Sequence, residues 1–300
     1  MMKFVTGIAI VAVSVVLLVL SAGAGSAPAQ SAPPGAKDEA VACERLDELL
    51  GPVPAPRKPC RIAAVLRFFG DQYWQILAAG MQSRANALGT DLDVRAAARA
   101  VEPFGQLSTA EDMVQRGCDA LIAAPMTEEN LKPVFEKIKG TGLPIVGIDD
   151  AMAGHRVSVD PYRTGVLAAA YFREKLQEGG RIAVIRGLSG AYVVRQRWAG
   201  FLDGLGKSGI AVVANVHADW DFQLAMDAAE CILRENPELK GFYCMNDVMA
   251  LGAVEAVKKH RPSERVIVVG TDGIGPAYES IRAGEMAATV DTYPHKTGEV

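Results

Sequence analysis

The stretch RIAAVLRFFGDQYWQILAAGM, residues 61–81, contains a complete strand–loop–helix unit. Its first part, Ile62–Leu66, is a continuous apolar run, which is typical of a parallel strand covered on both faces. Its last part begins a helix that we expect over residues 73–88, because apolar side chains recur there at helical spacing. A strand that leads through a short loop into an amphipathic helix predicts a parallel α/β sheet.

The same alternation of short apolar strands and amphipathic helices continues to the end of the chain. One strand stops at Pro125, and we expect Thr127 to cap the helix that follows, with Glu128 in its first turn. About ten strands are too many for one core of this size, so we predict an α/β protein of two Rossmann-like lobes with parallel sheets joined by a hinge. We place the N-terminal lobe at 61–160, with 292–300 returning to it, and the C-terminal lobe at 161–291.

The N-terminus has the features of a secretory signal. A short positive start is followed by the uncharged apolar run Phe4–Leu20 and then by Ala27-Pro28-Ala29, the small-x-small pattern of a cleavage site. We therefore predict a signal peptide at 1–29, a flexible leader at 30–60 and a periplasmic mature protein. An uncleaved anchor is the alternative, because the apolar run is almost long enough to span a membrane.

The chain contains five cysteines, and two of them flank a proline-rich stretch. We expect Cys43 and Cys60 to form a disulfide after export, since an oxidising compartment permits it; two unpaired thiols are the alternative. The other three cysteines lie in apolar contexts that are typical of core residues. None of the five has the spacing of a zinc site.

Composition excludes several functions. Hydrophobic residues make up 50% of the 300 and charged residues 22%, and the formal net charge is -4, so we predict a globular protein that does not bind nucleic acid. A transcriptional repressor would need an N-terminal helix-turn-helix, and the predicted signal peptide occupies that place. We find no Ser/His/Asp set and no phosphate loop, and the four histidines are scattered. We therefore expect no enzyme activity, no cofactor and no metal, and a monomer.

In parallel sheets, ligands bind beyond the carboxyl ends of the strands, so residues just after a strand are the candidate site. Some of them have simpler roles: Asp71, Asp219 and Asp247 each precede a helical run and fit helix caps. Arg195 fits an exposed residue as well as a ligand contact. The candidate ligand-binding residues are Arg67, Asp71, Tyr73, Trp74, Asp149, Asp150, Arg197, Trp220, Asn246 and Asp272.

These side chains suit a sugar. Each sugar hydroxyl donates one hydrogen bond and accepts two; carboxylates take the donated protons, while guanidinium and amide groups fill the lone pairs. Flat aromatic rings cover the C–H faces of the sugar ring. Two lobes that close over such a ligand remove these groups from water and make their geometry selective.

Several runs in the second half of the chain resemble the type I periplasmic binding proteins of sugar ABC importers, with the ribose-binding branch nearest in frame. The most specific runs are Asn246-Asp247-Val248-Met249-Ala250-Leu251-Gly252 and Gly270-Thr271-Asp272-Gly273, and the resemblance extends from residue 61 to the end. It implies that Tyr73 and Trp74 are the aromatic pair that packs on the ligand and that Trp220 is an aromatic residue of the second lobe. It also implies polar anchors at Asp149, Arg197, Asn246 and Asp272.

Three departures from the ribose-type pattern are informative. The doublet Asp149-Asp150 stands where those proteins carry Asp-Arg, and Arg67 and Asp71 replace small polar residues, which is more similar to the arabinose-binding branch. We therefore predict a small neutral sugar, a pentose or hexose, or else a polyol, captured for an ABC permease. The alternative is a periplasmic sensor that feeds a chemoreceptor or histidine kinase. Members of the family also continue past the last hinge strand with a further helix, whereas this sequence ends at Val300.

Overall fold

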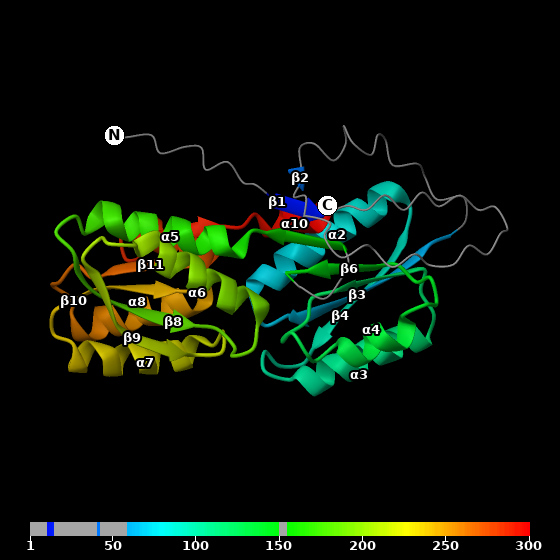
Figure 1. Cartoon of the computed structure of the whole chain (residues 1–300), viewed down its shortest axis with the longest axis horizontal. Helices are drawn as coiled ribbons and strands as arrows, with labels where there is room; N and C mark the ends of the chain where they lie inside the picture. Colours follow the sequence, from blue (N-terminus) through cyan, green and yellow to red (C-terminus); the bar gives the residue numbers. More distant parts are fainter. Residues whose placement is uncertain (1–10, 15–40, 43–58, 150–154) are drawn as a thin grey trace.

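The computed structural model describes residues 11–14, 41–42, 59–149 and 155–300. Their strands form two sheets that lie end to end (Figure 1). We call the sheet that contains β3 (Arg61–Phe68), together with its helices, the first lobe, and the sheet that contains β8 (Gly180–Arg186), together with its helices, the second lobe. Each lobe has five parallel strands, so the prediction of two α/β lobes with parallel sheets is confirmed.

The first lobe is built on strands in the order β2-β1-β7-β6-β5-β3-β4. Its parallel strands are β3 (Arg61–Phe68), β4 (Asp91–Ala97), β5 (Ala120–Ala123), β6 (Ile145–Ile148) and β7 (His155–Val159). Its helices are α2 (Gln72–Leu88), α3 (Pro103–Gln115), α4 (Lys132–Ile138) and α10 (Pro294–Glu299). The short strands β1 (Val11–Ser14) and β2 (Val41–Ala42) are antiparallel additions at the β7 edge. β1 lies within the segment that the sequence predicts to be removed.

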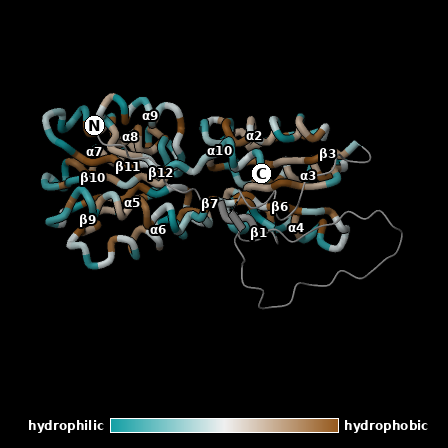
Figure 2. The backbone as a smooth tube through the Cα atoms, turned by 90° about the horizontal axis from the view of Figure 1, so that it is seen from above, coloured by the Kyte–Doolittle hydropathy of each residue, from teal (hydrophilic) through white to brown (hydrophobic). Residues whose placement is uncertain are grey.

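The second lobe has strands in the order β12-β11-β10-β8-β9. They are β8 (Gly180–Arg186), β9 (Ile210–His217), β10 (Leu239–Cys244), β11 (Ile267–Asp272) and β12 (Ala288–Asp291). The helices are α5 (Pro161–Lys175), α6 (Tyr192–Leu205), α7 (Phe222–Glu235), α8 (Asp247–His260) and α9 (Gly275–Arg282). Figure 2 shows α7, α8 and α9 on one side of this sheet and α5 and α6 on the other. Coverage on both faces explains why the strands are continuous apolar runs.

The chain crosses between the lobes twice within the described residues, from β7 to α5 and from β12 to α10. Hydrophobic stretches run through the middle of each lobe (Figure 2), where the core residues are almost fully buried. The two crossings leave the carboxyl ends of both sets of parallel strands facing the space between the lobes. This arrangement brings the post-strand loops of both lobes together.

Glycine allows close helix contacts in both lobes. A Cβ atom on Gly165 of α5 would lie 2.1 Å from the Arg197 carbonyl oxygen of α6, and one on Gly200 of α6 would lie 1.9 Å from the Tyr162 carbonyl oxygen. In the first lobe, a Cβ atom on Gly80 of α2 would lie 2.1 Å from the His295 carbonyl oxygen of α10. Real Cβ atoms do not approach backbone oxygens this closely, so these positions require glycine.

One predicted helix starts later than expected. Thr127 does accept hydrogen bonds at Oγ1 from the backbone amides of Glu129 and Asn130, at 3.4 and 3.2 Å, but it organises a turn rather than a helix. The helix itself, α4, begins at Lys132, and the prediction that it starts at Thr127 is wrong. Pro133 at the second helical position explains the later start, since proline suits the first turn of a helix. No helix in the described ranges is long and apolar enough to cross a membrane.

Candidate functional site

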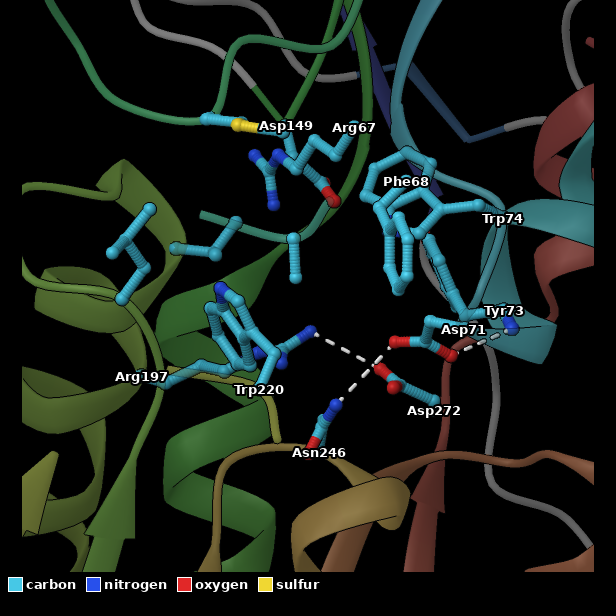
Figure 3. A pocket seen from close by; sticks show the side chains of 14 residues that line it. Arg67, Phe68, Asp71, Tyr73, Trp74, Asp149, Arg197, Trp220, Asn246 and Asp272 are labelled. Atoms are coloured by element: carbon cyan, nitrogen blue, oxygen red, sulfur yellow. Dashed lines mark hydrogen bonds and ion pairs between the residues drawn. The ribbon is translucent and has the colours of Figure 1, made fainter. Parts of the chain in front are cut away.

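A cavity lies between the lobes, and fourteen residues from both of them line it (Figure 3). The first lobe contributes Arg67, Phe68, Asp71, Tyr73, Trp74, Ala100, Met126 and Asp149, and the second contributes Leu188, Val193, Arg197, Trp220, Asn246 and Asp272. Ten of these residues lie at the ends of strands or in the loops just after them. The other four, Tyr73, Trp74, Val193 and Arg197, lie in the first two turns of the helices that follow. The arrangement follows from parallel strands whose carboxyl ends meet at one edge.

Arg67 is held firmly on the wall of the first lobe. Its Nε donates to the Pro125 carbonyl oxygen at 2.7 Å, and its guanidinium carbon lies 5.1 Å from the centre of the Trp74 ring. That distance is within the range of a cation–π interaction. The side chain is 7% exposed, so the positive charge sits inside the cavity wall with its orientation fixed.

The two aromatic residues at the start of α2 form a second part of the same wall. The Tyr73 and Trp74 rings meet edge to face with centroids 4.9 Å apart, and both are buried. Burial, with the charges of Asp149 and Asp272, raises the pKa of Tyr73 well above its ordinary value, so its hydroxyl stays protonated. The pair therefore offers flat apolar surface and a phenol group able to donate a hydrogen bond.

Asp149 directly follows β6 and has a left-handed conformation, with φ of 50°. Its Oδ1 accepts a hydrogen bond from the Ser158 hydroxyl of the neighbouring strand β7 at 2.7 Å. This bond leaves lone pairs on both carboxylate oxygens for other donors. Asp150 follows directly but lies outside the described residues, so its proposed part in the site stays a prediction.

Arg197 and Asp272 form the charged pair of the second lobe. Arg197 Nη1 donates to the Met245 carbonyl oxygen, and Nη2 lies 3.6 Å from Asp272 Oδ1. Burial by itself would lower the pKa of Arg197, but the nearby carboxylates, Asp272 above all, raise it, so the guanidinium stays charged. Arg197 Nε is buried and has no hydrogen-bond partner among the described residues. A buried donor without a partner is costly, which favours a bound acceptor at this place.

Asn246 joins the lobes at the floor of the cavity. Its Oδ1 accepts from the Met249 amide at 2.9 Å and so caps α8, while its Nδ2 donates toward Asp71 Oδ2 at 3.4 Å (Figure 3). Asp71 itself caps α2 through Oδ1, which accepts from the Tyr73 amide at 3.0 Å. The capping role suggested for Asp71 is therefore correct, and it leaves one carboxylate oxygen directed at the other lobe.

Asp247 does not cap α8, contrary to the alternative role suggested by the sequence; the residue before it does. Its buried carboxylate lies behind the cavity wall, where it accepts from the Thr289 hydroxyl at 2.6 Å and from the Gly273 and Ile274 amides at 2.8 and 3.0 Å. Burial raises the pKa of Asp247 to about 7 despite these bonds. The same cause raises the pKa of Asp272 well above its usual range, with Arg197 opposing the shift and Asp71 and Asp247 adding to it.

Trp220 reaches the cavity from the loop after β9. It has φ of 68° and its ring lies over Gly187, where an added Cβ atom would come within 2.1 Å of the ring. Asp219 before it has φ of 49° and does not cap α7. Asp221 does, by accepting from the Leu224 amide at 2.8 Å, so the suggested cap at Asp219 is wrong.

Backbone strain concentrates at this site. Non-glycine residues with φ in the left-handed range are uncommon, and each costs on the order of 1–3 kcal/mol. Among the five such residues in the described ranges, Asp149, Trp220 and Asp272 line the cavity. Strain that persists at cavity residues is typical of a functional site.

Nine of the ten candidate ligand-binding residues line this one cavity, and the tenth, Asp150, lies outside the described residues. Arg195, which fitted either a ligand contact or a surface residue, is exposed and does not line the cavity. The lining residues that the candidate set omits are Phe68, Ala100, Met126, Leu188 and Val193. Met126 and Leu188 lie in the loops after β5 and β8, so the post-strand rule could have found them, but apolar residues in loops give no chemical signal of their own.

The described ranges contain no group of three or more His, Cys, Asp or Glu side chains placed to hold a metal ion. The cavity offers groups suited to reversible recognition: charged and amide groups of both lobes, aromatic faces, and a hydrogen bond between the lobes. A two-lobed α/β protein with such a cavity belongs to the class of solute-binding proteins that close on their ligand.

The comparison with known families places the chain within that class. The family model described as the periplasmic binding protein domain matches residues 62–300, and the chain belongs to this family. The family consists of solute-binding proteins, which bind their ligands without catalysing a reaction.

Individual relatives agree with this assignment. The D-allose-binding periplasmic protein of Escherichia coli strain K12 is 32% identical over 249 residues, which are 79% of this chain and 80% of that protein. A periplasmic solute-binding protein of an ABC transporter from Actinobacillus succinogenes 130z, solved with bound D-allose, is 30% identical with a TM-score of 0.74 over 80% of this chain and 87% of that one. A carbohydrate transporter solute-binding protein from Agrobacterium radiobacter, in complex with D-arabinose, is 26% identical with a TM-score of 0.75 over 81% and 86%.

Proposed function

We propose that this protein captures a small neutral sugar, a pentose or hexose, between its lobes in the periplasm and delivers it to an ABC importer. The observation that carries this proposal is the cavity, in which carboxylates, guanidinium groups and an amide from both lobes surround a space faced by Tyr73, Trp74 and Trp220. Hydroxyl groups both donate and accept, so a sugar uses groups of both kinds, while the rings cover its apolar faces.

The charges favour a neutral ligand. Asp71, Asp149 and Asp272 oppose Arg67 and Arg197 within the cavity, so the two signs nearly balance. A cation would meet two fixed guanidinium groups and an anion three carboxyl groups, and like charges are costly in a closing, low-dielectric cleft. The sequence also predicts that Asp150 faces the ligand. The relatives named for D-allose and D-arabinose support an aldose as the ligand class.

A thermal-shift screen tests the proposal. The panel contains D-allose, D-ribose, both arabinoses, D-glucose, D-galactose and xylitol, with putrescine and citrate as charged controls. A ligand that binds only the folded state raises the melting temperature, and the shift grows with the logarithm of its concentration relative to its dissociation constant. We expect one aldose to give the largest shift and the charged controls none. Calorimetry with that aldose should then show an affinity that falls less than tenfold from low to high salt, and a steeper fall would contradict a neutral ligand.

The role as an importer subunit needs a separate test, because a sensor could use the same cavity. The purified protein, loaded with its sugar, is added to its permease in vesicles, and ATP hydrolysis is measured. Stimulation by the loaded protein and not by the ligand-free protein is the expected result. Failure to stimulate, together with loading of a receptor kinase, would support the sensor alternative.

We also propose that residues 1–29 are removed on export and that Cys43 then pairs with Cys60. Both proposals rest on sequence features, and Cys43 lies outside the described residues. Closing a loop of this length is worth on the order of 3 kcal/mol in the chain-entropy model. N-terminal sequencing of periplasmic material should begin at Gln30, and non-reducing peptide mapping should find the two cysteines in one linked peptide. An intact Met1 in the membrane fraction would contradict cleavage.

A further inference from the structure

The rim of the cavity carries a pair of side chains that connect the lobes without touching the cavity. Glu128 lies in the turn after β5 of the first lobe, and Arg195 lies in the first turn of α6 in the second lobe. Arg195 Nη2 donates to Glu128 Oε1 at 2.7 Å, and Nη1 donates to Oε2, so the guanidinium and carboxylate meet through two parallel bonds. Neither residue lines the cavity.

A backbone bond between the lobes lies beside this pair. The Glu128 amide donates to the Gly190 carbonyl oxygen of the second lobe at 3.1 Å. Gly190, with φ of 82°, shapes the loop between β8 and α6, so its carbonyl oxygen can reach the other lobe. Glu128 therefore contacts the second lobe through its side chain and its main chain together.

The turn that carries Glu128 is fixed from below by a buried side chain. Gln106 of α3 is fully buried, and its Oε1 accepts from the Met126 amide at 3.0 Å and from Asn130 Nδ2 at 2.8 Å. Its own amide nitrogen donates to the Leu66 and Ala124 carbonyl oxygens, both at 2.9 Å. These bonds tie both ends of the turn to strands of the first lobe, so little order has to be gained when Glu128 meets its partner.

In the second lobe, Arg195 is held by its place on α6 and by contact with an aromatic ring. Arg195 projects from α6, and its guanidinium carbon lies 5.8 Å from the centre of the Tyr192 ring. Arg156, from β7 of the first lobe, lies 5.9 Å from the same ring. Tyr192 therefore has cation–π contacts with both lobes, which adds a second link at the same rim.

We propose that Glu128 and Arg195 form a cross-lobe bridge that stabilises the closed conformation and slows the release of the bound ligand. They are positioning residues, because they act on the lobes and not on the ligand. The part of this proposal that concerns ligand release rests on the proposed function. Rotation at the hinge that opens the cavity would separate the two lobes and break both bonds. The bridge therefore contributes free energy to the closed state alone, whichever ligand is bound.

The expected effect is moderate, because Arg195 is 60% exposed and Glu128 24% exposed. Exposed ion pairs contribute little, and salt screens them, although two parallel bonds from a fixed carboxylate are better than the average pair. Loss of the bridge should therefore raise the dissociation rate about two- to fivefold, with little change in the association rate.

The first test needs no ligand. Small-angle X-ray scattering measures the radius of gyration of the wild type, of Glu128→Gln and of Glu129→Gln at low and at high salt. Glu129 is the matched control, because its carboxylate bonds Lys132 Nζ at 2.6 Å within the first lobe. At low salt we expect Glu128→Gln to be more open than the wild type and Glu129→Gln to match the wild type. High salt should remove the difference.

The second test measures release of D-allose by stopped-flow fluorescence. Glu128→Gln and Arg195→Gln should each release the sugar about two- to fivefold faster, and the exchanged pair Glu128→Arg with Arg195→Glu should restore most of the slow release. Glu128→Gln with wild-type radius and wild-type release would overturn the bridge, as would an equal effect of Glu129→Gln. If D-allose does not bind the wild type, that result counts against the proposed sugar, and the scattering experiment alone decides the bridge.

Discussion

The two halves of the cavity differ in what they offer. The first lobe provides most of the flat surface, with Phe68, Tyr73 and Trp74 from β3 and α2, and its Arg67 and Asp149 are held by bonds within that lobe. The second lobe provides a buried polar cluster, in which Arg197, Asn246, Asp247 and Asp272 lie on neighbouring elements.

The difference extends from the cavity into the hinge. In the second lobe, the Asp272 carbonyl oxygen accepts from the Thr292 amide and hydroxyl, both at 3.1 Å, just where the chain crosses back to the first lobe. Asp247 holds β12, the last strand before that crossing, through the Thr289 hydroxyl. Changes to the cavity residues of the first lobe should therefore alter affinity alone, whereas changes to the polar cluster of the second lobe should alter stability as well.

The largest effect we expect is a pH-dependent loss of stability through Asp247. Its pKa of about 7 in the folded protein lies well above the ordinary 3.8, so the folded state binds the proton more tightly than the unfolded state. Stability must then fall as pH rises from about 4 to about 7, by up to about 4 kcal/mol from this group. Urea unfolding at several pH values measures it, as the difference between the wild type and Asp247→Asn. Asp227→Asn, which removes an exposed carboxylate on α7, is the control; a constant difference across this pH range would contradict the prediction.

Arg197→Ala should produce the next largest effect, this time on affinity. A charge-assisted hydrogen bond is worth roughly 1.5–3 kcal/mol, so the dissociation constant for the identified sugar should rise about ten- to a hundredfold. Asp272 would also lose its buried ionic partner, and stability should fall as well. Calorimetry and thermal unfolding give the two values, with the exposed Arg234→Ala as control. An unchanged affinity would remove Arg197 from the site.

Gly165→Ala and Gly80→Ala compare the close helix contacts of the second lobe with those of the first. The new methyl group would press on the Arg197 carbonyl oxygen, and overpacking of this kind costs about 1–3 kcal/mol. Because α6 carries Arg197, we expect lower melting temperature and weaker sugar binding together. Gly80→Ala presses α10 away from α2 in the same manner in the first lobe. It should lower the melting temperature with a smaller change in affinity, and equal affinity losses would show that the halves do not differ.

Trp220→Phe should have the smallest effect on affinity, below about 1 kcal/mol, because a flat ring remains over the ligand. Since Trp220 and Trp74 face the cavity from opposite lobes, sugar binding should change tryptophan fluorescence. The variant should lose a large part of that change, and titration by fluorescence measures it. Trp198→Phe is the control, because Trp198 packs beside Arg186 and does not line the cavity. An undiminished signal would place Trp220 outside the site.

The class of fold and the position of the site along the chain could both be predicted from the residue pattern. Apolar runs such as Ile62–Leu66, each followed by an amphipathic helix, allow only parallel sheets covered on both faces. Once the strands are parallel, their carboxyl ends must meet at one edge. Residues such as Asn246 and Asp272, which lie at the carboxyl ends of neighbouring strands of one sheet, therefore had to come together, although they are far apart in the sequence.

Which of two neighbouring residues takes which role depends on how the helices and lobes pack together. Arg195 and Arg197 lie about 200° apart around α6, and the close contact with α5 at Gly165 turned the second of them into the cavity. Asn246 caps α8 while Asp247 points into the interior, although both residue types suit a cap. The bonds from Asp71 to Asn246 and from Glu128 to Arg195 join residues of different lobes. Local periodicity specifies which residues share a strand or a helix face, but contacts between lobes depend on the closure angle, which no local pattern encodes.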